Sequence, residues 1–399
     1  MIEAHGSAKQ PLGMSPAHFL RDYWQKKPLL IRRFATEGFD GAVFDSVTPD
    51  DLAGLSCEEA VLSRIVTHFP QEDRWQVRNG PFDESDFSRL GDGNWTLLVQ
   101  DVDKWDMDVA AVLDRFAFIP SWRVDDVMIS YATDGGGVGP HVDQYDVFLV
   151  QGMGRRRWRI DTDAQANQAF REDSELRILE TFAPTHDWTL EPGDALYLPP
   201  GVAHDGVAIG ECMTWSIGMR APSQAELLLD LAEFLAEPLG EDRRYRDPDL
   251  VPAKDPAEID SVSLERVRAV LPHFTQLDDS VLGDWFGRFI TRYRSAQIAA
   301  APERAPTEAA LLRDLPRSSL LRNPFSRFAW RKRAAAADLF VAGDSWPCSI
   351  PFARLVAGER VVAGDALAKV CADARSKQAL VALVAAGHLH ITRRKRTAG

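Results

Sequence analysis

A chain of 399 residues is longer than one ordinary hydrophobic core uses, so two or three domains are expected. Its 45% hydrophobic and 26% charged residues are typical of a globular protein, and no apolar run reaches the roughly eighteen residues of a transmembrane helix. Because no basic-then-apolar leader follows Met1 and the four cysteines lack a CxxC spacing, we expect a cytoplasmic protein with neither a disulfide framework nor a zinc site.

Charge is unevenly distributed along the chain. Of the 46 Lys and Arg and the 59 Asp and Glu, 17 and 8 lie from Pro302 onward, which leaves 29 and 51 in residues 1–301. The front of the protein is therefore strongly acidic. A field of this sign repels nucleic acid and attracts basic partners, such as a protein rich in Arg and Lys. The alternative is that the acidic residues serve solubility alone.

The first predicted elements are a helix and a strand within residues 15–34. Ser15 can cap the helix with Pro16 at its first position, and Pro28 separates the helix from the apolar strand LLIRRF. A short helix pair is expected from Leu52 onward. The next segments predict an Asn-Gly turn within RWQVRNGPF and a strand in WTLLVQ.

Between residues 123 and 220, predicted strands alternate with turns rich in Gly and Pro. This pattern predicts an antiparallel barrel or sandwich, with a site at one mouth and a cavity along its axis. We expect the last strand to lie beside the strand that carries the site. The predicted strands are RVDDVMISYA, HVDQYDVFLV, GRRRWRID, LRILETF, DWTLEPGDALYLP and CMTWSIGMR.

Three side chains of this region form a candidate metal site. His141 and Asp143 stand two residues apart after the glycine-rich GGGVGP, so on a strand or its end both point to one side. His204 follows the strand ALYLP and its Pro-Pro-Gly turn. Two imidazoles and one carboxylate on one face of an octahedral ion leave the other face open, as in non-haem Fe(II) oxygenases. Taken alone, His141 could be a turn residue and Asp143 an Asx turn. His186 is the strongest alternative histidine, but it lacks a strand-end motif.

The segments GGGVGPHVDQYDVFLV and PGDALYLPPGVAHDG together resemble the two signature segments of the cupin, or double-stranded β-helix, fold in its JmjC-type form. This resemblance implies an Fe(II) oxygenase that uses 2-oxoglutarate and O2 as co-substrates. It also implies that His141, Asp143 and His204 are the metal ligands. No side chain is nominated as a general base, because the iron and the co-substrate supply the chemistry.

The resemblance also assigns the residues that bind the co-substrate. Arg156 stands fifteen residues after His141, the spacing of the basic residue that holds the distal carboxylate of 2-oxoglutarate in this superfamily. A guanidinium can bind such a carboxylate with two parallel hydrogen bonds and stays charged when buried. Ser130 is implied as a second contact. The neighbours Arg155 and Arg157 point the other way on a strand and fit an exposed basic rung.

Residues 222–301 are predicted to be helical. The segments APSQAELLLDLAEFLAEPL, SLERVRAVL and SVLGDWFGRFITRYRSA form amphipathic helices, and a Pro- and Asp-rich linker, DPDLVPAKDPAEID, follows the first of them. The helices carry more apolar surface than a lone pair can bury. Packing against the barrel is one explanation, and the family resemblance adds dimerisation through this region.

The last hundred residues read as helix, strand, helix, helix and strand, which resembles a winged helix. A basic RRKR tail at residues 393–396 would suggest nucleic-acid binding in isolation. However, the preceding residues are not unusually basic, and a terminal run of charge is usually a solvated end. We therefore expect a structural or protein-docking role for this domain and no nucleic-acid partner.

Over nearly its whole length the chain resembles the bacterial ribosomal oxygenase group. An α+β fold is expected, with a JmjC-type cupin domain in residues 1–221, a helical dimerisation region in 222–301 and a winged helix in 302–399. The reaction implied by the closest members is 3-hydroxylation of an arginine in the sixteenth large-subunit ribosomal protein, a basic substrate. The alternatives are a histidine hydroxylase, an N-methyl-lysine demethylase, a cupin with chemistry independent of 2-oxoglutarate, and a winged-helix regulator whose barrel senses a ligand.

Overall fold

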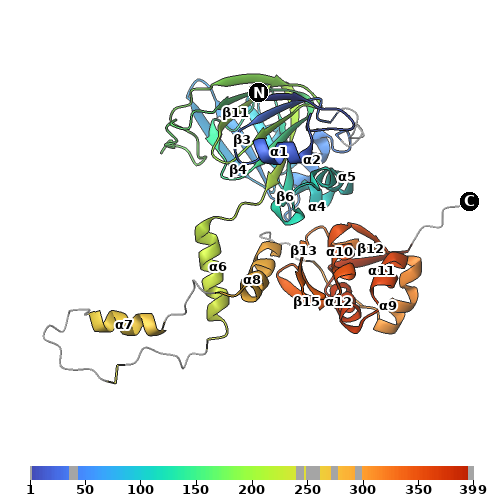
Figure 1. The fold of residues 1–399 in the computed structure, drawn as a ribbon. Helices are drawn as coiled ribbons and strands as arrows, with labels where there is room; N and C mark the ends of the chain where they lie inside the picture. The colour runs from blue at the N-terminus through green and yellow to red at the C-terminus, as the bar shows by residue number, and fades with distance from the viewer. Residues whose placement is uncertain are drawn as a thin grey trace, which may run out of the picture. The chain divides into compact units, whose positions relative to one another are not determined.

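The structure, a computed structural model, describes residues 2–35, 44–239, 247–248, 261–270, 277–292 and 299–393. Its contacts divide the chain into two compact units, Met1–Ala221 and Pro222–Gly399 (Figure 1). The basic tail after Arg393 and most of the Pro- and Asp-rich linker lie outside the described residues. Among the described helices, none is both long and apolar enough to cross a bilayer.

The first unit consists of one large sheet with short helices around it. Its helices are α1 (Pro16–Asp22), α2 (Pro49–Ser56), α3 (Glu84–Ser88), α4 (Val102–Trp105) and α5 (Met107–Val112). Its strands are β1 (Glu3–His5), β2 (Leu29–Arg32), β3 (Ser63–Phe69), β4 (Arg74–Asn79), β5 (Trp95–Val99), β6 (Val124–Ala132), β7 (His141–Val142), β8 (Val147–Asp161), β9 (His186–Leu190), β10 (Ala195–Leu198) and β11 (Ala203–Met219).

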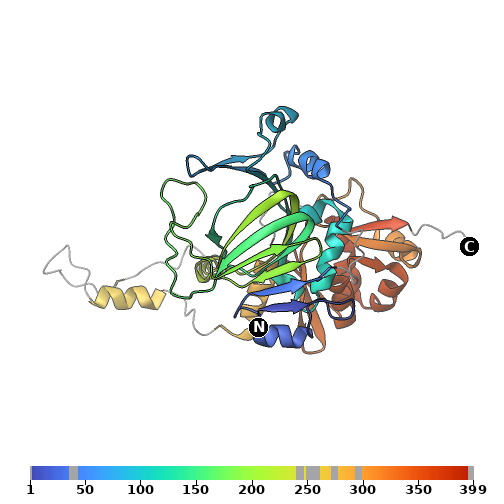
Figure 2. The ribbon, with the colours of Figure 1, turned by 90° about the horizontal axis from the view of Figure 1, so that it is seen from above.

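The sheet follows the order β1-β2-β10-β8-β11-β6-β5-β3-β4, while β7 pairs with β11 and β9 with β8. All pairings are antiparallel except β1 with β2. The long green strands β6, β8 and β11 lie side by side in Figure 2. Because neighbours in the sheet order are distant in sequence, segments far apart in the chain are brought together on its faces.

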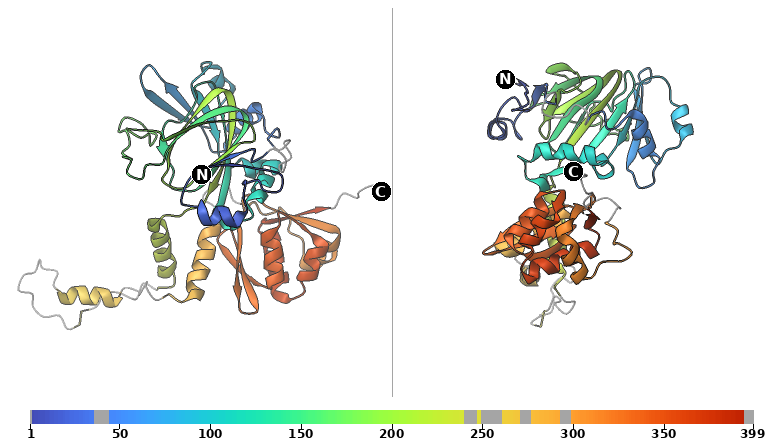
Figure 3. Two further views of the ribbon diagram at one scale, coloured as in Figure 1. Left: turned by 45° about the horizontal axis from the view of Figure 1, so that its top comes forward. Right: turned by 90° about the vertical axis from the view of Figure 1, so that its right-hand side faces the viewer.

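The two faces of this sheet bury different side chains. Phe148 and Val150 of β8 point into the main core, which also contains Val102 of α4 and Val109 of α5. Figure 3 shows these two helices in teal next to the strands. Leu149 points to the opposite face, into a second, smaller core. Alternation along the strands therefore separates a structural face from the face that carries the candidate site.

The N-terminal helix begins as its sequence predicts. The Ser15 hydroxyl accepts a hydrogen bond from the His18 amide, and Pro16 occupies the first turn. The helix ends at Asp22, and β2 begins at Leu29, directly after Pro28.

Several strand predictions need correction. The segment LRILETF is not a strand: only an isolated bridge joins Leu179 to Phe170, and Ile178 and Leu179 are buried because they pack on the glycine-rich loop. CMTWSIGM is not a separate strand, because it continues β11, whose first residues carry His204. It does lie, as expected, beside the predicted strand HVDQYDVFLV, since Trp215–Gly218 pair with Val147–Val150. Asn79, the first residue of the predicted Asn-Gly turn, is the last residue of β4. The turn of the β3–β4 hairpin comes earlier, at residues 70–73.

The second unit contains helices and two three-stranded sheets, ordered β16-β12-β17 and β13-β14-β15. Its helices are α6 (Gln224–Ala236), α7 (Ser261–Val270), α8 (Asp279–Thr291), α9 (Glu308–Asp314), α10 (Ile350–Gly358), α11 (Gly364–Val370) and α12 (Ala374–Ala385). Its strands are β12 (Ser318–Arg322), β13 (Phe328–Arg333), β14 (Ala336–Val341), β15 (Asp344–Cys348), β16 (Val361–Ala363) and β17 (Leu389–Arg393).

The first strand predicted in the last hundred residues, the segment ADLFVAGDSWPCSI, is a hairpin in the structure. Ala342 and Gly343 both have positive φ, 52° and 97°, which is the geometry of a tight two-residue turn between β14 and β15. The Ala-Gly pair lacks the Asn-Gly or Asp-Gly composition usual for such turns. For this reason the turn was not predicted.

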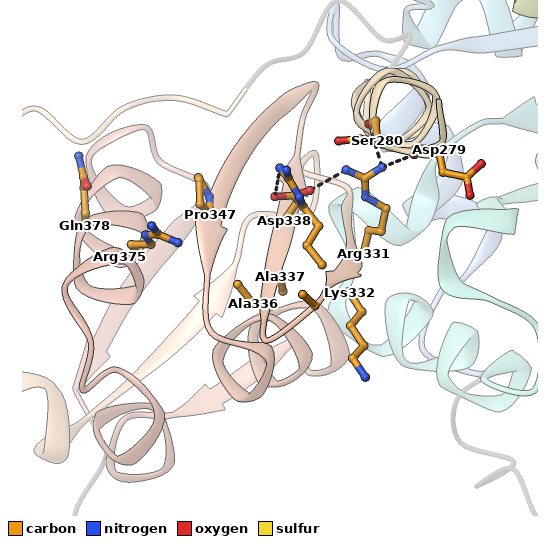
Figure 4. Close-up of a pocket in the computed structure, with 12 residues that line it drawn as sticks. Asp279, Ser280, Arg331, Lys332, Ala336, Ala337, Asp338, Pro347, Arg375 and Gln378 are labelled. Carbon is orange, nitrogen blue, oxygen red and sulfur yellow. Dashed lines mark hydrogen bonds and ion pairs between the residues drawn. The ribbon is translucent and has the colours of Figure 1, made fainter. Parts of the chain in front are cut away.

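Helix α8 packs on this hairpin sheet, although it lies within the predicted helical region 222–301. Gly287 fits directly against the Phe340 ring, 2.4 Å from an added Cβ atom, so the two elements meet closely. The Arg331 guanidinium of β13 donates to the Asp279 and Ser280 carbonyls of α8. Figure 4 shows this contact at one side of a groove whose other side is formed by α12. The helical region and the hairpin sheet are therefore not packed as separate bodies.

Candidate metal centre

The structure brings His141, Asp143 and His204 together. His141 on β7 pairs directly with His204 on β11, and Asp143 follows β7. One Asp143 carboxylate oxygen, Oδ2, lies 3.9 Å from His141 Nε2 and 3.6 Å from His204 Nε2. The three potential ligand atoms all lie within 4.8 Å of one another, and among the described residues no other group of three such side chains does so.

Hydrogen bonds fix the orientation of both imidazole rings. His141 Nδ1 lies 2.9 Å from the Gly139 carbonyl oxygen, and His204 Nδ1 lies 2.9 Å from that of Val202. A carbonyl only accepts, so each Nδ1 carries the proton and each Nε2 keeps its lone pair. Both Nε2 atoms therefore face Asp143 as ready metal ligands, with the backbone contacts that ligating histidines ordinarily have.

The site is buried on one side and open on the other. The His204 side chain is 3% exposed, whereas those of His141 and Asp143 are 25% and 24% exposed. Burial, together with the neighbouring His141, lowers the pKa of His204 to about 4. The His204 imidazole is therefore neutral at pH 7. A ligand can approach from the exposed side of the site, where His141 and Asp143 lie.

Glycines let the backbone pass close to the site. A Cβ atom on Gly137 would lie 2.6 Å from the Gly206 carbonyl oxygen, so this loop packs directly on the backbone of β11. Gly139 has a φ of +78°, and an added Cβ would lie 3.2 Å from Ile178 and 3.3 Å from Trp75. Because the Gly139 carbonyl accepts the His141 Nδ1 proton, its position fixes the orientation of that ring.

We expect Gly139→Ala to destabilise the protein by about 2 kcal/mol, from backbone strain at positive φ and from crowding against two side chains. It should also weaken metal binding, because the Gly139 carbonyl would shift. Gly210→Ala is the matched control: its φ is +69°, but nothing lies within 4 Å of an added Cβ. It should cost about 1 kcal/mol and leave cobalt(II) affinity unchanged. Urea unfolding and cobalt(II) titration measure the two effects, and equal metal affinity in both variants would contradict the assignment.

Arg156 lies on the same face of the β8–β11 ladder as His204. His204 pairs with Ile160, Gly206 with Trp158 and Ala208 with Arg156, so Arg156 is four residues, or about 13 Å, further along the strand. The Arg156 residue is 4% exposed, and its Nε and Nη2 atoms are buried without a hydrogen-bond partner in the part of the chain that the structure describes. A buried guanidinium with free donors fits a carboxylate that comes from outside the chain.

Ser130 lies on β6, opposite Thr214 of β11. It is 3% exposed, and its hydroxyl donates only a long hydrogen bond of 3.4 Å to the Thr214 carbonyl. The Thr214 hydroxyl in turn donates to Gln151 Oε1 at 3.2 Å. A short row of buried polar side chains thus crosses β6, β11 and β8.

Two further residues near the site were not predicted. Trp158, two residues after Arg156, has its ring centroid 5.9 Å from that of His204. Gly206 lies opposite Trp158, and an added Cβ there would lie 2.6 Å from the indole ring. Period-two alternation from Arg156 could have found Trp158, because residues two apart on a strand share a face. Its pairing with Gly206 depends on the register between β8 and β11, which cannot be predicted from the sequence of either strand.

The alternative histidine, His186, is the first residue of β9. Its Nδ1 atom shares a 2.9 Å hydrogen bond with the Thr185 hydroxyl, and its ring stacks near Trp188. It is not part of the three-residue group. Arg155 and Arg157 are exposed, and Arg157 forms an ion pair with Asp187.

Residues 111–227 match the JmjC domain family and residues 274–390 the ROXA-like winged helix family. The chain is 41% identical over 292 residues to the ribosomal protein uL16 3-hydroxylase of Escherichia coli (strain K12), covering 71% of this chain and 74% of that protein. The X-ray structure of Escherichia coli YcfD superimposes with a TM-score of 0.80 and 34% identity, covering 95% of this chain and 98% of that chain. YcfD, a ribosomal oxygenase, in complex with cobalt and 2-oxoglutarate matches over the same shares, with a TM-score of 0.77 and 33% identity.

These matches span both units. They identify the fold as a JmjC cupin joined to a winged helix, and the chain belongs to the family of JmjC-type ribosomal oxygenases.

Proposed function

We propose that this protein is an Fe(II)- and 2-oxoglutarate-dependent oxygenase that hydroxylates C3 of an arginine side chain in the large-subunit ribosomal protein uL16. The observation that carries the proposal is the clustering of His141, Asp143 and His204, within 4.8 Å, in a chain 41% identical to a uL16 3-hydroxylase. Two imidazole nitrogens and a carboxylate oxygen match the donor set of non-haem Fe(II) oxygenases.

In this proposal each residue of the site has a defined task. His141 and His204 donate their Nε2 lone pairs, and Asp143 donates a carboxylate oxygen that offsets part of the metal charge. Arg156 binds the distal carboxylate of 2-oxoglutarate through its free Nε and Nη2 donors, and Ser130 adds a hydroxyl contact. When bound, the iron and the co-substrate supply the oxidation of the substrate C–H bond with O2, releasing succinate and CO2. The protein positions these groups and excludes water from the buried side.

The substrate assignment is supported by homology and by charge. The relative is named for uL16, and residues 1–301 carry 51 acidic against 29 basic side chains, a field that attracts a basic ribosomal protein. We also propose that the reaction takes place in the cytoplasm, because the proposed substrate is a ribosomal protein. The competing reactions at the same centre are histidine hydroxylation and N-methyl-lysine demethylation.

Mass spectrometry of uL16 tests this function. The purified protein is incubated with Fe(II), 2-oxoglutarate, O2 and uL16, and we expect one arginine to gain about 16 Da, the mass of an oxygen atom, with one succinate released per hydroxylation. Oxygen gained on a histidine, or a mass loss of about 14 Da from a methylated lysine, would support a competing reaction. Arginine modification without succinate release would contradict dependence on 2-oxoglutarate.

The finer architecture is part of the same proposal. We infer that the large sheet of the first unit closes as a double-stranded β-helix barrel, because β8 and β11 form a long central ladder with the metal site at one end. We also infer a homodimer formed through α6 and α7. Leu228 and Leu229 of α6 are 57% and 72% exposed, and Leu264 of α7 is 45% exposed, which is unusual for leucines outside an interface.

We expect the double substitution Leu228→Asp and Leu229→Asp to convert the dimer to a monomer, because each buried leucine contributes about 1.5–3 kcal/mol to an interface and a charge there is desolvated. Sedimentation analysis of the full chain measures the mass. Leu62→Asp is the matched control, since Leu62 is also 55% exposed but lies in the first unit. A doubly substituted chain that stays dimeric would contradict dimerisation through α6.

A further inference from the structure

Trp158 has an unused hydrogen-bond donor in the interior of the first unit. The residue is 5% exposed, and its indole Nε1 is buried without a hydrogen-bond partner among the described residues. Buried indole N–H groups are ordinarily paired, since an unmet buried donor costs about 1–3 kcal/mol. A donor left free beside a ligand site can meet an acceptor that the ligand supplies.

The position of Trp158 connects this donor with the proposed co-substrate site. The residue lies between Arg156 and Ile160 on one face of β8, and the Arg156 guanidinium carbon is 5.7 Å from the indole centroid. The His204 ring centroid is 5.9 Å away on the other side. Trp158 therefore occupies the stretch between the metal ligands and the basic residue, which a bound 2-oxoglutarate must span.

Gly206 fixes which edge of the indole is available. The atoms nearest to an added Cβ on Gly206 are Cη2, Cζ3 and Cε3 of Trp158, at 2.6–2.8 Å, so the benzo edge lies against β11. The Nε1 edge is the opposite one and faces away from Gly206. The glycine thus makes room for the ring and leaves its N–H side for another contact.

Trp215 provides a comparison within the same sheet. Its Nε1 is also buried without a partner among the described residues, but the residue lies in the main core on the other face, beside Phe44. Trp158, in contrast, lies beside the unpaired Nε and Nη2 donors of Arg156, and three free donors in one place match the acceptor capacity of a carboxylate.

We propose that Trp158 is a further co-substrate-binding residue, whose indole N–H donates a hydrogen bond to the distal carboxylate that Arg156 holds. This inference rests on the proposed function, because it concerns the same 2-oxoglutarate site. It gives the carboxylate a third donor in addition to the two of the guanidinium. It also explains why the residue opposite Trp158 is a glycine.

The test compares Trp158→Phe with the wild type. Phenylalanine keeps an aromatic ring and removes the N–H group. The full-length protein is loaded with cobalt(II) without O2, and 2-oxoglutarate is titrated while the cobalt d–d absorption is recorded. We expect the Kd for 2-oxoglutarate to rise about tenfold, the effect of losing one hydrogen bond to a charged group. The unliganded cobalt spectrum and the cobalt affinity should stay unchanged, which shows that the variant is folded and the metal ligands are in place.

Two controls separate the N–H contact from packing. Trp215→Phe should leave the Kd for 2-oxoglutarate unchanged, because its indole lies on the other face of the sheet. Titration with 2-oxopentanoate, which has a methyl group in place of the distal carboxylate, should give the same Kd for the wild type and Trp158→Phe. An unchanged Kd for 2-oxoglutarate in Trp158→Phe, or an equal loss for both ligands, overturns the inference. A wild type that binds no 2-oxoglutarate refutes the proposed function itself.

Discussion

Replacing His204 by alanine should abolish hydroxylation, with turnover falling at least about a thousandfold, or about 4 kcal/mol in transition-state stabilisation. His204 is the most buried of the three candidate ligands, and its Nε2 lies 3.6 Å from the Asp143 carboxylate. Removing it leaves one imidazole and one carboxylate, which cannot occupy a full face of an octahedral ion. Metal binding should weaken together with activity, because both depend on the same three donors.

The measurements are cobalt(II) titration of the purified variant and mass spectrometry of uL16 after incubation with Fe(II) and 2-oxoglutarate. His186→Ala is the matched control, because His186 lies in the same unit but outside the three-residue group. It should bind cobalt and hydroxylate as the wild type does. Normal metal affinity in His204→Ala would exclude His204 as a ligand and with it the proposed metal centre.

Arg156→Met should raise the Kd for 2-oxoglutarate at least about a hundredfold, since two parallel hydrogen bonds to a charged carboxylate are lost, each contributing about 1.5–3 kcal/mol. The same substitution should stabilise the protein without ligands by about 1–3 kcal/mol. The reason is that Arg156 is 4% exposed and its Nε and Nη2 atoms have no partner among the residues that the structure describes. A methionine of similar length fills the space without a buried charge. Weaker binding together with higher stability is the signature of a side chain placed for a ligand.

Isothermal titration of the cobalt-loaded protein with 2-oxoglutarate measures the first effect, and urea unfolding of the metal-free protein measures the second. Arg155→Met is the control: Arg155 is the adjacent residue on β8, but it is exposed and points to the other face. It should change neither quantity. If Arg156→Met destabilises the protein while leaving 2-oxoglutarate affinity intact, Arg156 has a structural role only.

The resemblance to ribosomal oxygenases was visible in the sequence and is confirmed by the comparisons. The family could be recognised because metal binding restricts which residue types stand at a few neighbouring positions of the sequence. A two-residue spacing places His141 and Asp143 together, and a strand that ends at Pro-Pro-Gly introduces His204. The helix N-cap at Ser15 was also predicted correctly, since capping depends on a few neighbouring residues. The roles of the site residues remain predictions for the experiments above.

The elements that sequence reasoning misassigned share a physical cause. LRILETF is apolar because it packs on the glycine-rich loop, and burial of a loop gives the same apolar pattern as a strand. Helix α8 was predicted within a separate helical region, but Gly287 fits against Phe340 of the hairpin sheet. The sequence of an amphipathic helix shows which face is apolar, but it does not show which element that face packs against.

The sequence by itself was enough to predict His141, Asp143 and His204 as metal ligands, because few residue types bind a metal and these stand at characteristic spacings. Arg156 and Ser130 were predicted as dicarboxylate ligands from the family resemblance. Only the tertiary structure decided that His141 pairs with His204, that Gly206 lies under Trp158, and that the free donors of Arg156 and Trp158 share one face. These relations depend on the register between strands that are distant in the chain. Register is set by the packing of both faces of the sheet at once, which no single segment encodes.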